Sequence, residues 1–238
     1  MPPLVKYLAN LGYGSRREVT RMVQDGQVTD PSGAALSSDS RIAHADVRVG
    51  GEPLDPPPGS VIVMHKPLGY VCSTTDAHNP VVYDLLPSRF RARSPIVAPV
   101  GRLDLDTSGL LLLTDDGAIN HRLTSPRSHL PKTYLATLAE PLRGDEAGVF
   151  ASGTLHLQGD VDAVAPAQFQ AVGERIARVI LTEGRYHQVR RMFAAVGHHV
   201  HALERIAVGT LTLGDLPSGA WRVLTEAECA LLTSRPTA

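Results

Sequence analysis

The 238-residue sequence predicts an α+β protein, in which a small N-terminal module precedes a larger domain with a mostly antiparallel mixed β-sheet flanked by helices. Three observations predict this class. Helical periodicity opens the chain, a proline-rich break follows at residues 56–60, and short strand-like stretches dominate the remainder. Hydrophobic residues make up 43% of the chain, which is enough for a packed core at this length.

Two helices are expected at the start of the N-terminal module. The first covers residues 4–11 and ends at nearby glycines. The second begins with the capping-box pattern SRRE at residues 15–18, continues with apolar residues at i, i+3 and i+4 spacing from Val19, and ends at Gly26. In a capping box the serine and the glutamate satisfy backbone N–H groups that the first helical turn leaves unpaired, so this helix start is well defined.

Short strands are expected next, at residues 27–29 and 46–49, and Gly50-Gly51 is suited to a tight hairpin turn. The sequence PPPGS at residues 56–60 then predicts a stiff linker. We therefore expect an N-terminal domain of residues 1–55 and, after the linker, a second domain of residues 61–238.

The second domain is expected to contain several strands and two clear helices. The strands are predicted at residues 61–65, 96–100, 110–114, 133–138, 176–182 and 209–213. The first helix covers residues 186–196, because apolar residues recur at i, i+3, i+4 and i+7 spacing from Val189 and Gly197 can cap its C-terminus. The second is a short helix that begins with a capping box at Thr225.

Composition argues against several classes of protein. The longest purely aliphatic run is Leu110–Leu113, whereas a membrane-spanning helix needs roughly 20 apolar residues. The N-terminus carries no signal-peptide pattern, so we expect a cytoplasmic protein without membrane association. Cys72 and Cys229 are the two cysteines, and their separation fits neither a metal site nor a redox motif.

The formal net charge of −1 gives no general argument for a nucleic-acid partner, but the charges are unevenly distributed. Basic residues gather in three acid-poor stretches at residues 85–103, 117–139 and 185–205. If the fold brings these stretches together, they form a local phosphate-binding surface on a neutral protein. Taken singly, each stretch favours an ordinary solvated face.

The polar run GRLDLDTSG at residues 101–109 lies between two predicted strands. A loop fixed at both ends by strands is a suitable support for a reactive carboxylate, which makes Asp104 a candidate and Asp106 a weaker one. The residues alone favour a different interpretation, in which Asp106, Thr107 and Ser108 form a turn by bonding their own backbone.

Five stretches of the sequence occur in the order found in one family of enzymes. They are KPLGYVCST at 66–74, GRLDLDTSGLLLLTDDG at 101–117, TSPRSHLPKTYLATL at 124–138, EGRYHQVRRMFAAVGHHV at 183–200 and LPSGAWRVLTEAE at 216–228. Over nearly its whole length the sequence resembles the RsuA-type family of bacterial ribosomal small-subunit pseudouridine synthases.

That resemblance implies a pseudouridine synthase fold and an isomerase that breaks the bond from uracil N1 to ribose, rotates the base and rejoins it through C5. Such a reaction needs a carboxylate but neither a cofactor nor a metal. The implied partner is ribosomal RNA, as 16S rRNA or an assembling small-subunit particle, with the uridine-516 site as target and a monomeric enzyme. The same chemistry at a 23S rRNA uridine is the alternative.

By the same resemblance, Asp104 is the nucleophile, Arg190 is the arginine that pairs with it, and Tyr134 stacks on the target base. A carboxylate covered by RNA has to stay ionised, and a neighbouring arginine stabilises that form. Arg102 is expected to fill the space left by the flipped base or to hold the adjacent phosphate. The further RNA-binding candidates in these stretches are Lys132, Arg185, His187 and Arg191.

The N-terminal module resembles the S4 RNA-binding domain through Lys6, the SRRE phrase and GQVTD at residues 26–30. In that family the basic second helix lies on RNA backbone, and the residues that this implies here are Lys6, Arg16, Arg17 and Arg21. The family's opening Arg-Leu-Asp-Lys is replaced here by Pro3-Leu4-Val5-Lys6, and His65 stands where the enzymes have asparagine in an Asn-Lys-Pro phrase. A small helical cap without RNA contact is the alternative.

Two other functions remain open from the sequence. A non-catalytic RNA-binding factor for ribosome assembly would use a basic surface without requiring Asp104, Tyr134 and Arg190 together. A carboxylate-based glycoside hydrolase would need a second acid in a recognisable motif, which we do not find. The HHVH run at residues 198–201 lacks the spacing of zinc ligands, so we expect its histidines at the surface or on RNA.

Overall fold

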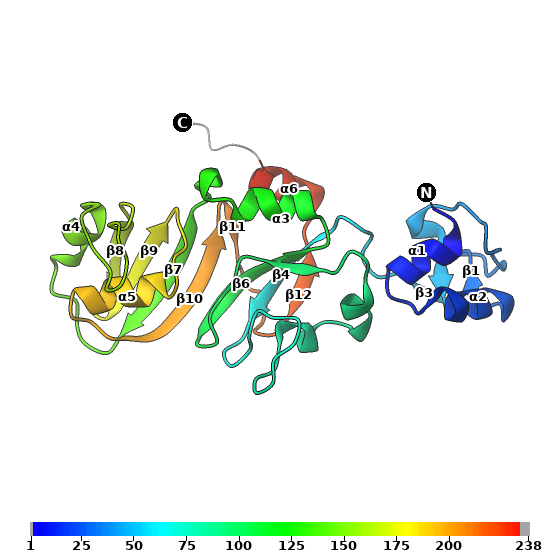
Figure 1. Ribbon diagram of the computed structural model, residues 1–238, viewed down its shortest axis with the longest axis horizontal. Helices are drawn as coiled ribbons and strands as arrows, with labels where there is room; N and C mark the ends of the chain where they lie inside the picture. Colours follow the sequence, from blue (N-terminus) through cyan, green and yellow to red (C-terminus); the bar gives the residue numbers. More distant parts are fainter. Residues whose placement is uncertain (1, 234–238) are drawn as a thin grey trace.

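The computed structural model describes residues 2–233, which form two separate sheets connected through the segment 54–60 (Figure 1). A three-stranded sheet belongs to the N-terminal module, and a nine-stranded sheet belongs to the rest of the chain. No helix within residues 2–233 is long and apolar enough to cross a membrane.

The N-terminal module packs two helices against its small sheet. Its elements are α1 (Leu4–Asn10), α2 (Arg16–Gln24), β1 (Val28–Thr29), η1 (His44–Asp46), β2 (Arg48–Val49) and β3 (Glu52–Pro53). The predicted capping box is present at the start of α2, where the side chains of Ser15 and Glu18 each accept a hydrogen bond from the other residue's backbone N–H. Gly50 and Gly51 both have positive φ, as a two-residue hairpin between β2 and β3 requires.

This module is attached to the larger domain by contacts with η3 (Ser88–Ala92). The Asp55 carboxylate accepts two hydrogen bonds from Arg89, at 2.7 and 3.0 Å, and the Asp55 N–H donates to the Tyr13 hydroxyl. The backbone at Gly12 passes so close to Arg89 that an added Cβ would clash with its carbonyl oxygen. Farther along the linker, the Gly59 N–H donates to Asp115 at 2.7 Å.

The nine-stranded sheet has the order β12-β4-β6-β10-β7-β9-β8, with β5 paired to β6 and β11 paired to β10. Its strands are β4 (Val61–Lys66), β5 (Ala98–Val100), β6 (Thr107–Thr114), β7 (Lys132–Leu138), β8 (Gln168–Gly173), β9 (Ile176–Leu181), β10 (Val200–Val208), β11 (Leu211–Thr212) and β12 (Trp221–Val223). Among the described strands, β6 and β10 alone run parallel, with Thr107 opposite Leu203. The predicted α+β class with a mostly antiparallel sheet is confirmed.

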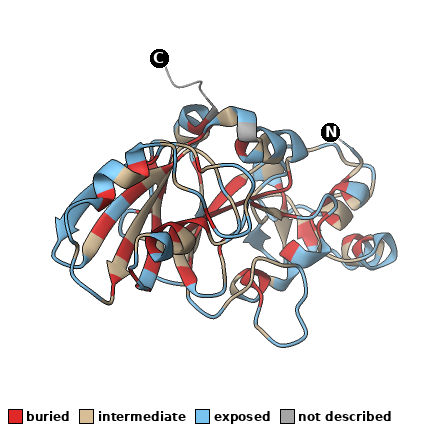
Figure 2. Ribbon diagram, turned by 60° about the vertical axis from the view of Figure 1, so that its left-hand side comes forward, coloured by how far each residue is buried: buried red, intermediate tan, exposed pale blue. Residues whose placement is uncertain are grey.

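Helices cover the large sheet, and the buried residues run along its strands (Figure 2). α3 (Gly117–Thr124) and α6 (Glu226–Thr233) pack against residues such as Val63 and Leu112, whereas alternate residues of the same two strands, such as Ile62 and Leu111, contact η2 (Val82–Leu85) and η3. α4 (Glu146–Ala151) and α5 (Gln188–Ala195) pack on β7, β9 and β10. One short 3-10 turn, η4 (Pro126–Ser128), follows α3.

The structure differs from the sequence prediction at several elements. β8, β10, β12, α3 and α4 are additional, and β10 is the longest strand described. Its sequence VHALERIAV contains charged residues, yet Arg205 is 4% exposed because its Nε donates to the Leu110 carbonyl oxygen within the sheet. Thr107 and Ser108, which the residues alone assign to a turn, belong to β6, where they pair with Leu203 and Glu204.

Candidate active site

A pocket of about 650 Å³ opens where β6, β7 and the segment before α5 meet. It brings together residues that are far apart in the sequence. Those predicted as site residues that line it are Arg102, Asp104, Lys132, Tyr134, Arg185 and His187. Arg190 and Arg191 do not line it. Tyr134 lies in β7 opposite Arg205 of β10, so the sheet itself places the tyrosine beside the pocket floor.

The turn that carries Asp104 is fixed from below by a buried lysine. Lys66 is fully buried at the end of β4, and its ammonium donates to the carbonyl oxygens of Pro67, Asp104 and Thr107 at 3.0, 3.0 and 2.8 Å. All three donors of the ammonium are therefore satisfied. Burial lowers the pKa of Lys66, and the carboxylates of Asp104 and Asp106 act in the opposite direction.

Close approach of two strands sets the position of this turn. Gly109 of β6 pairs with Arg205 of β10, and its φ is +106°. An added Cβ would lie 2.7 Å from the Arg205 backbone nitrogen and would clash with its carbonyl oxygen. Glycine is thus required where β6 leaves the turn, because another side chain would separate the two parallel strands.

The Asp104 carboxylate faces His187. Oδ1 of Asp104 lies 3.4 Å from Nε2 of His187, and the two side chains are 32% and 34% exposed. His187 precedes α5 in a left-handed conformation, with φ 48° and ψ 33°. Its ring stacks on Tyr186 with a centroid distance of 3.9 Å and an interplanar angle of 16°. Asp104 is therefore accessible from the pocket and has one neighbouring side chain that is cationic when protonated.

Arg190 pairs with Asp106, which corrects the expectation that it pairs with Asp104. Its Nη2 lies 3.0 Å from Oδ2 of Asp106 and donates to the Asp106 carbonyl oxygen at 2.7 Å, while Nη1 donates to the Val200 carbonyl oxygen at 2.8 Å. The reason lies in the strand register. Because Thr107 pairs with Leu203, Asp106 lies beside the start of β10, which is where the Arg190 side chain ends.

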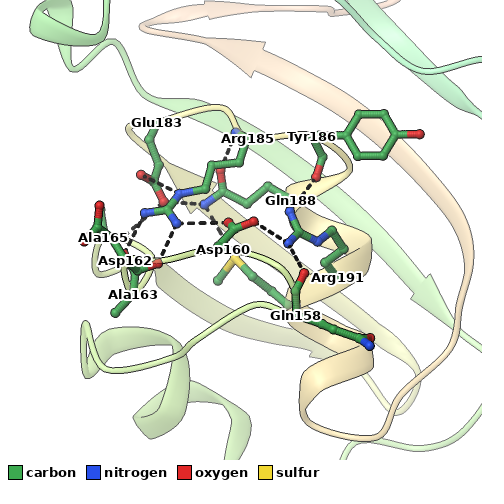
Figure 3. Close-up of polar contacts among 11 residues, drawn as sticks. Gln158, Asp160, Asp162, Ala163, Ala165, Glu183, Arg185, Tyr186, Gln188 and Arg191 are labelled. Carbon is green, nitrogen blue, oxygen red and sulfur yellow. Dashed lines mark hydrogen bonds and ion pairs between the residues drawn. The ribbon is translucent and has the colours of Figure 1, made fainter.

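Arg185 and Arg191, both RNA-binding candidates from the sequence, form ion pairs within the protein. They share the Asp160 carboxylate, Arg185 through Oδ2 at 3.0 Å and Arg191 through Oδ1 at 2.6 Å (Figure 3). Arg191 also donates to the carbonyl oxygens of Gln158 and Tyr186. Hydrogen bonds from Arg191 and Arg185 lower the pKa of Asp160. We call Asp160 with these two arginines the Asp160 cluster; it ties the segment before α5 to the loop at residues 158–163.

Comparisons with known proteins identify the family of this chain. A family model described as RNA pseudouridylate synthase matches residues 60–195. The chain belongs to the RNA pseudouridylate synthase family. It is therefore an RNA pseudouridine synthase, an isomerase, as the sequence motifs predict.

Several curated relatives of this synthase carry the name ribosomal small subunit pseudouridine synthase A. The protein from Escherichia coli strain K12 is 42% identical over 214 residues, which cover 88% of this chain and 88% of the relative. The protein from Vibrio cholerae is 38% identical over 229 residues, which cover 95% of this chain and 97% of the relative. A crystal structure of a pseudouridylate synthase, 34% identical, matches with a TM-score of 0.69 and covers 98% of this chain and all of that one.

The synthase has basic side chains in two different situations. Arg89, Arg91 and Arg93 of the first basic stretch each form an ion pair, with Asp55, Asp84 and Asp115 respectively. Among the RNA-binding candidates, five exposed cations form no ion pair within residues 2–233: Lys6, Arg16, Arg17, Arg21 and Arg102. All five are exposed, the first four on α1 and α2 and the fifth at the pocket. Lys132 is half-buried in the pocket, and this burial lowers its pKa.

Sequence reasoning missed three parts of this site. Lys66 is part of the KPLGYVCST stretch, but nothing in that stretch shows that the ammonium is buried under the Asp104 turn. Nothing in the sequence around Asp160 indicates a role, since the arginines that it binds lie far along the chain. His198 was expected at the surface or on RNA, but it is 4% exposed, because its Nε2 lies 2.7 Å from a buried Glu146 carboxylate.

Proposed function

We propose that this synthase isomerises a uridine of small-subunit ribosomal RNA, at the uridine-516 site, with Asp104 as the nucleophile. The observation that carries the proposal is that Asp104 lines a 650 Å³ pocket together with Tyr134 and His187, on a turn whose Asp104 carbonyl oxygen accepts a hydrogen bond from the buried Lys66 ammonium. The 36–42% identity to curated small-subunit synthases supports the RNA class.

The pocket explains how a uridine is reached. A uridine inside folded RNA has to be extruded before a side chain can attack it. The half-buried ring of Tyr134 offers a π face to the extruded uracil, and its hydroxyl is a proton donor or acceptor. Arg102 at the pocket edge is placed to occupy the vacated space or to bind the phosphate next to it.

Asp104 then has the position of a nucleophile. Asp104 forms a bond to the substrate that is broken again before release. The bond between uracil N1 and ribose C1′ breaks, the base rotates, a bond forms between C5 and C1′, the C5 proton is lost to water and N1 takes up a proton, so the product is an isomer of the substrate. Lys66 fixes the backbone of the Asp104 turn through the Asp104 carbonyl oxygen, and His187, when protonated, places a positive charge 3.4 Å from the carboxylate. Arg190 acts as a positioning residue, since it fixes the turn through Asp106 and touches β10 through Val200.

The N-terminal module is the proposed binding site for RNA outside the pocket. We propose residues 1–55 as an S4-like RNA-binding domain, residues 56–60 as a linker and residues 61–238 as the catalytic domain. Support comes from the separate three-stranded sheet and from the unpaired cations Arg16, Arg17 and Arg21 on the exposed face of α2. Cations without an internal partner are free to replace counterions on RNA phosphates.

Tritium release tests the proposal. The native chain is incubated with 16S transcript, or with an assembling small-subunit particle, labelled at uracil C5, and isomerisation releases the label to water. Asp104→Asn is expected to release none while it still binds RNA, and the matched variant Asp106→Asn is expected to release it. Equal release by the native chain and Asp104→Asn would remove Asp104 from its role. Release from 23S but not 16S transcript would move the target to the large subunit.

A further inference from the structure

An exposed aromatic ring stands at the rim of the pocket. Tyr186 is 76% exposed and lines the pocket from the segment between β9 and α5. Figure 3 shows its ring pointing away from the hydrogen-bonded residues around Asp160, to which the tyrosine is linked by its carbonyl oxygen. The side chain is thus held out at the pocket rim instead of being packed into the core.

One face of this ring is already covered by His187. The two rings are nearly parallel, at 16°, with centroids 3.9 Å apart. Through Nε2 at the edge of its ring, His187 lies 3.4 Å from Asp104. From the nucleophile outward the order is therefore Asp104, His187, Tyr186. With one face on His187 and 76% of the residue exposed, Tyr186 leaves its second face open.

The backbone under the stacked pair is held rigidly. The left-handed conformation of His187 is uncommon for a residue with a side chain and persists only where neighbouring contacts impose it. Those contacts are the hydrogen bonds from Arg191 to the Tyr186 carbonyl oxygen and from the Arg185 N–H to the buried Gln188 side chain. An aromatic ring fixed in this way loses little conformational entropy when a ligand stacks on it.

We infer that Tyr186 is a stacking platform for a nucleobase next to the target uridine. The inference rests on the proposed function, because it takes the pocket as the uridine site. A base on the open face of Tyr186 is separated by the Tyr186 ring from His187, the residue that contacts Asp104, so it is a neighbour of the attacked uridine and not the uridine itself. Stacking on an aromatic side chain is tolerant of base identity. Tyr186 therefore contributes affinity and RNA register, and it is a positioning residue.

Binding to a 16S fragment that contains uridine 516 tests the platform. Fluorescence anisotropy is measured with Asp104→Asn protein, so that no turnover interferes. Adding Tyr186→Ala is expected to weaken binding about tenfold or more, whereas Tyr186→Phe restores it because the ring is kept. The matched control is Val161→Ala, a 91% exposed apolar residue of the nearby 158–163 loop, which is expected to bind as before.

An abasic scan identifies the stacked base. Single abasic nucleotides are placed on either side of the uridine. At one position, the abasic site is expected to weaken RNA binding by the Asp104→Asn protein as much as Tyr186→Ala does. Combining that abasic site with Tyr186→Ala is expected to weaken binding no further. In the protein that keeps Asp104, Tyr186→Ala is expected to raise KM and leave kcat unchanged. A substitution that disturbed His187 and Asp104 would instead lower kcat. Three results would overturn the inference: unchanged binding by Tyr186→Ala, additive losses of binding at every abasic position, or a fragment that binds neither protein. Tritium release by the native chain is read separately, so failure of the proposed function is recognised independently.

Discussion

Asp104 and Asp106 are separated by one residue but have different surroundings. Asp104 lies at the pocket, with His187 as its neighbouring ionisable side chain. Asp106 has a side chain that is 57% exposed, and its carboxylate is occupied by Arg190. One carboxylate is thus accessible from the pocket and the other is held by Arg190, which is the difference expected if Asp104 is the proposed nucleophile.

Arg190 gives a prediction at this scale. Arg190→Ala is expected to lower the single-turnover rate of tritium release about 100-fold, since a displacement of about 1 Å at the reacting group has this effect. Asp106→Asn is expected to lower it by less than about tenfold, because Arg190 keeps its two carbonyl acceptors at Asp106 and Val200. A larger loss for Asp106→Asn than for Arg190→Ala would contradict the bracing role of the arginine.

At the scale of elements, the start of α5 is fixed by a loop that lies outside the pocket. Arg185 makes further hydrogen bonds to the carbonyl oxygens of Asp162 and Ala163, and Gln188 donates to Glu183 at 2.6 Å (Figure 3). The segment that carries Tyr186 and His187 is thereby held at both ends. We therefore expect the loop between α4 and β8 to influence the geometry at Asp104 through this segment.

Asp160→Asn tests this control. An amide is uncharged and has one acceptor oxygen instead of two, so both arginines of the Asp160 cluster lose their ion pair and one of them also loses its hydrogen bond. We expect kcat for tritium release to fall about tenfold or more while the protein stays folded by circular dichroism. Asp162→Asn is the matched control, because it removes the same charge two residues away and only the Asp162 carbonyl oxygen binds Arg185. Equal kcat values for the two variants would refute the role of the cluster.

Sequence reasoning succeeds for elements whose pattern is local. The capping box at Ser15, the apolar strands β4 and β6, and the stripe of α5 are all recognisable from residue spacing. β10 is missed because its charged residues are satisfied only by distant partners, as Arg205 is by Leu110. The same limit applies to the site: the motif identifies Asp104, but which acid Arg190 contacts depends on the register between β6 and β10.

At the scale of the whole molecule, a buried hydrogen bond between Glu146 and His198 joins α4 to the segment just before β10. Glu146 and His198 are 1% and 4% exposed and lie 2.7 Å apart. Burial raises the pKa of Glu146, but hydrogen bonds from the N–H of Arg143, from its own N–H, from His198 and from the N–H of Gly144 outweigh it and lower the pKa to about 2. The folded state therefore favours the ionised carboxylate.

This pKa predicts how stability depends on pH. A carboxyl group whose pKa is lower in the folded than in the unfolded protein stabilises the fold above its ordinary value of 4.5, and this contribution disappears as the pH falls toward about 2. The stabilisation is on the order of 3 kcal/mol. Urea unfolding across this range is expected to show a smaller loss of stability with acid for Glu146→Gln than for the native chain. The exposed control Glu174→Gln should keep the native dependence of stability on pH. The same dependence for Glu146→Gln as for the native chain would contradict the prediction.

The order of strands in the large sheet has a consequence for how the protein is made. β4, near the start of the domain, pairs with β12, and the Asp104 turn is completed only when β10 inserts between β6 and β7. On the ribosome, the N-terminal module can fold as soon as it emerges, because its strands are neighbours in sequence. The pocket cannot. The emerging chain can pair β6 with the earlier strands β4 and β5, but the edge of β6 that β10 covers stays open until synthesis is almost finished, so we expect activity to appear only late in synthesis.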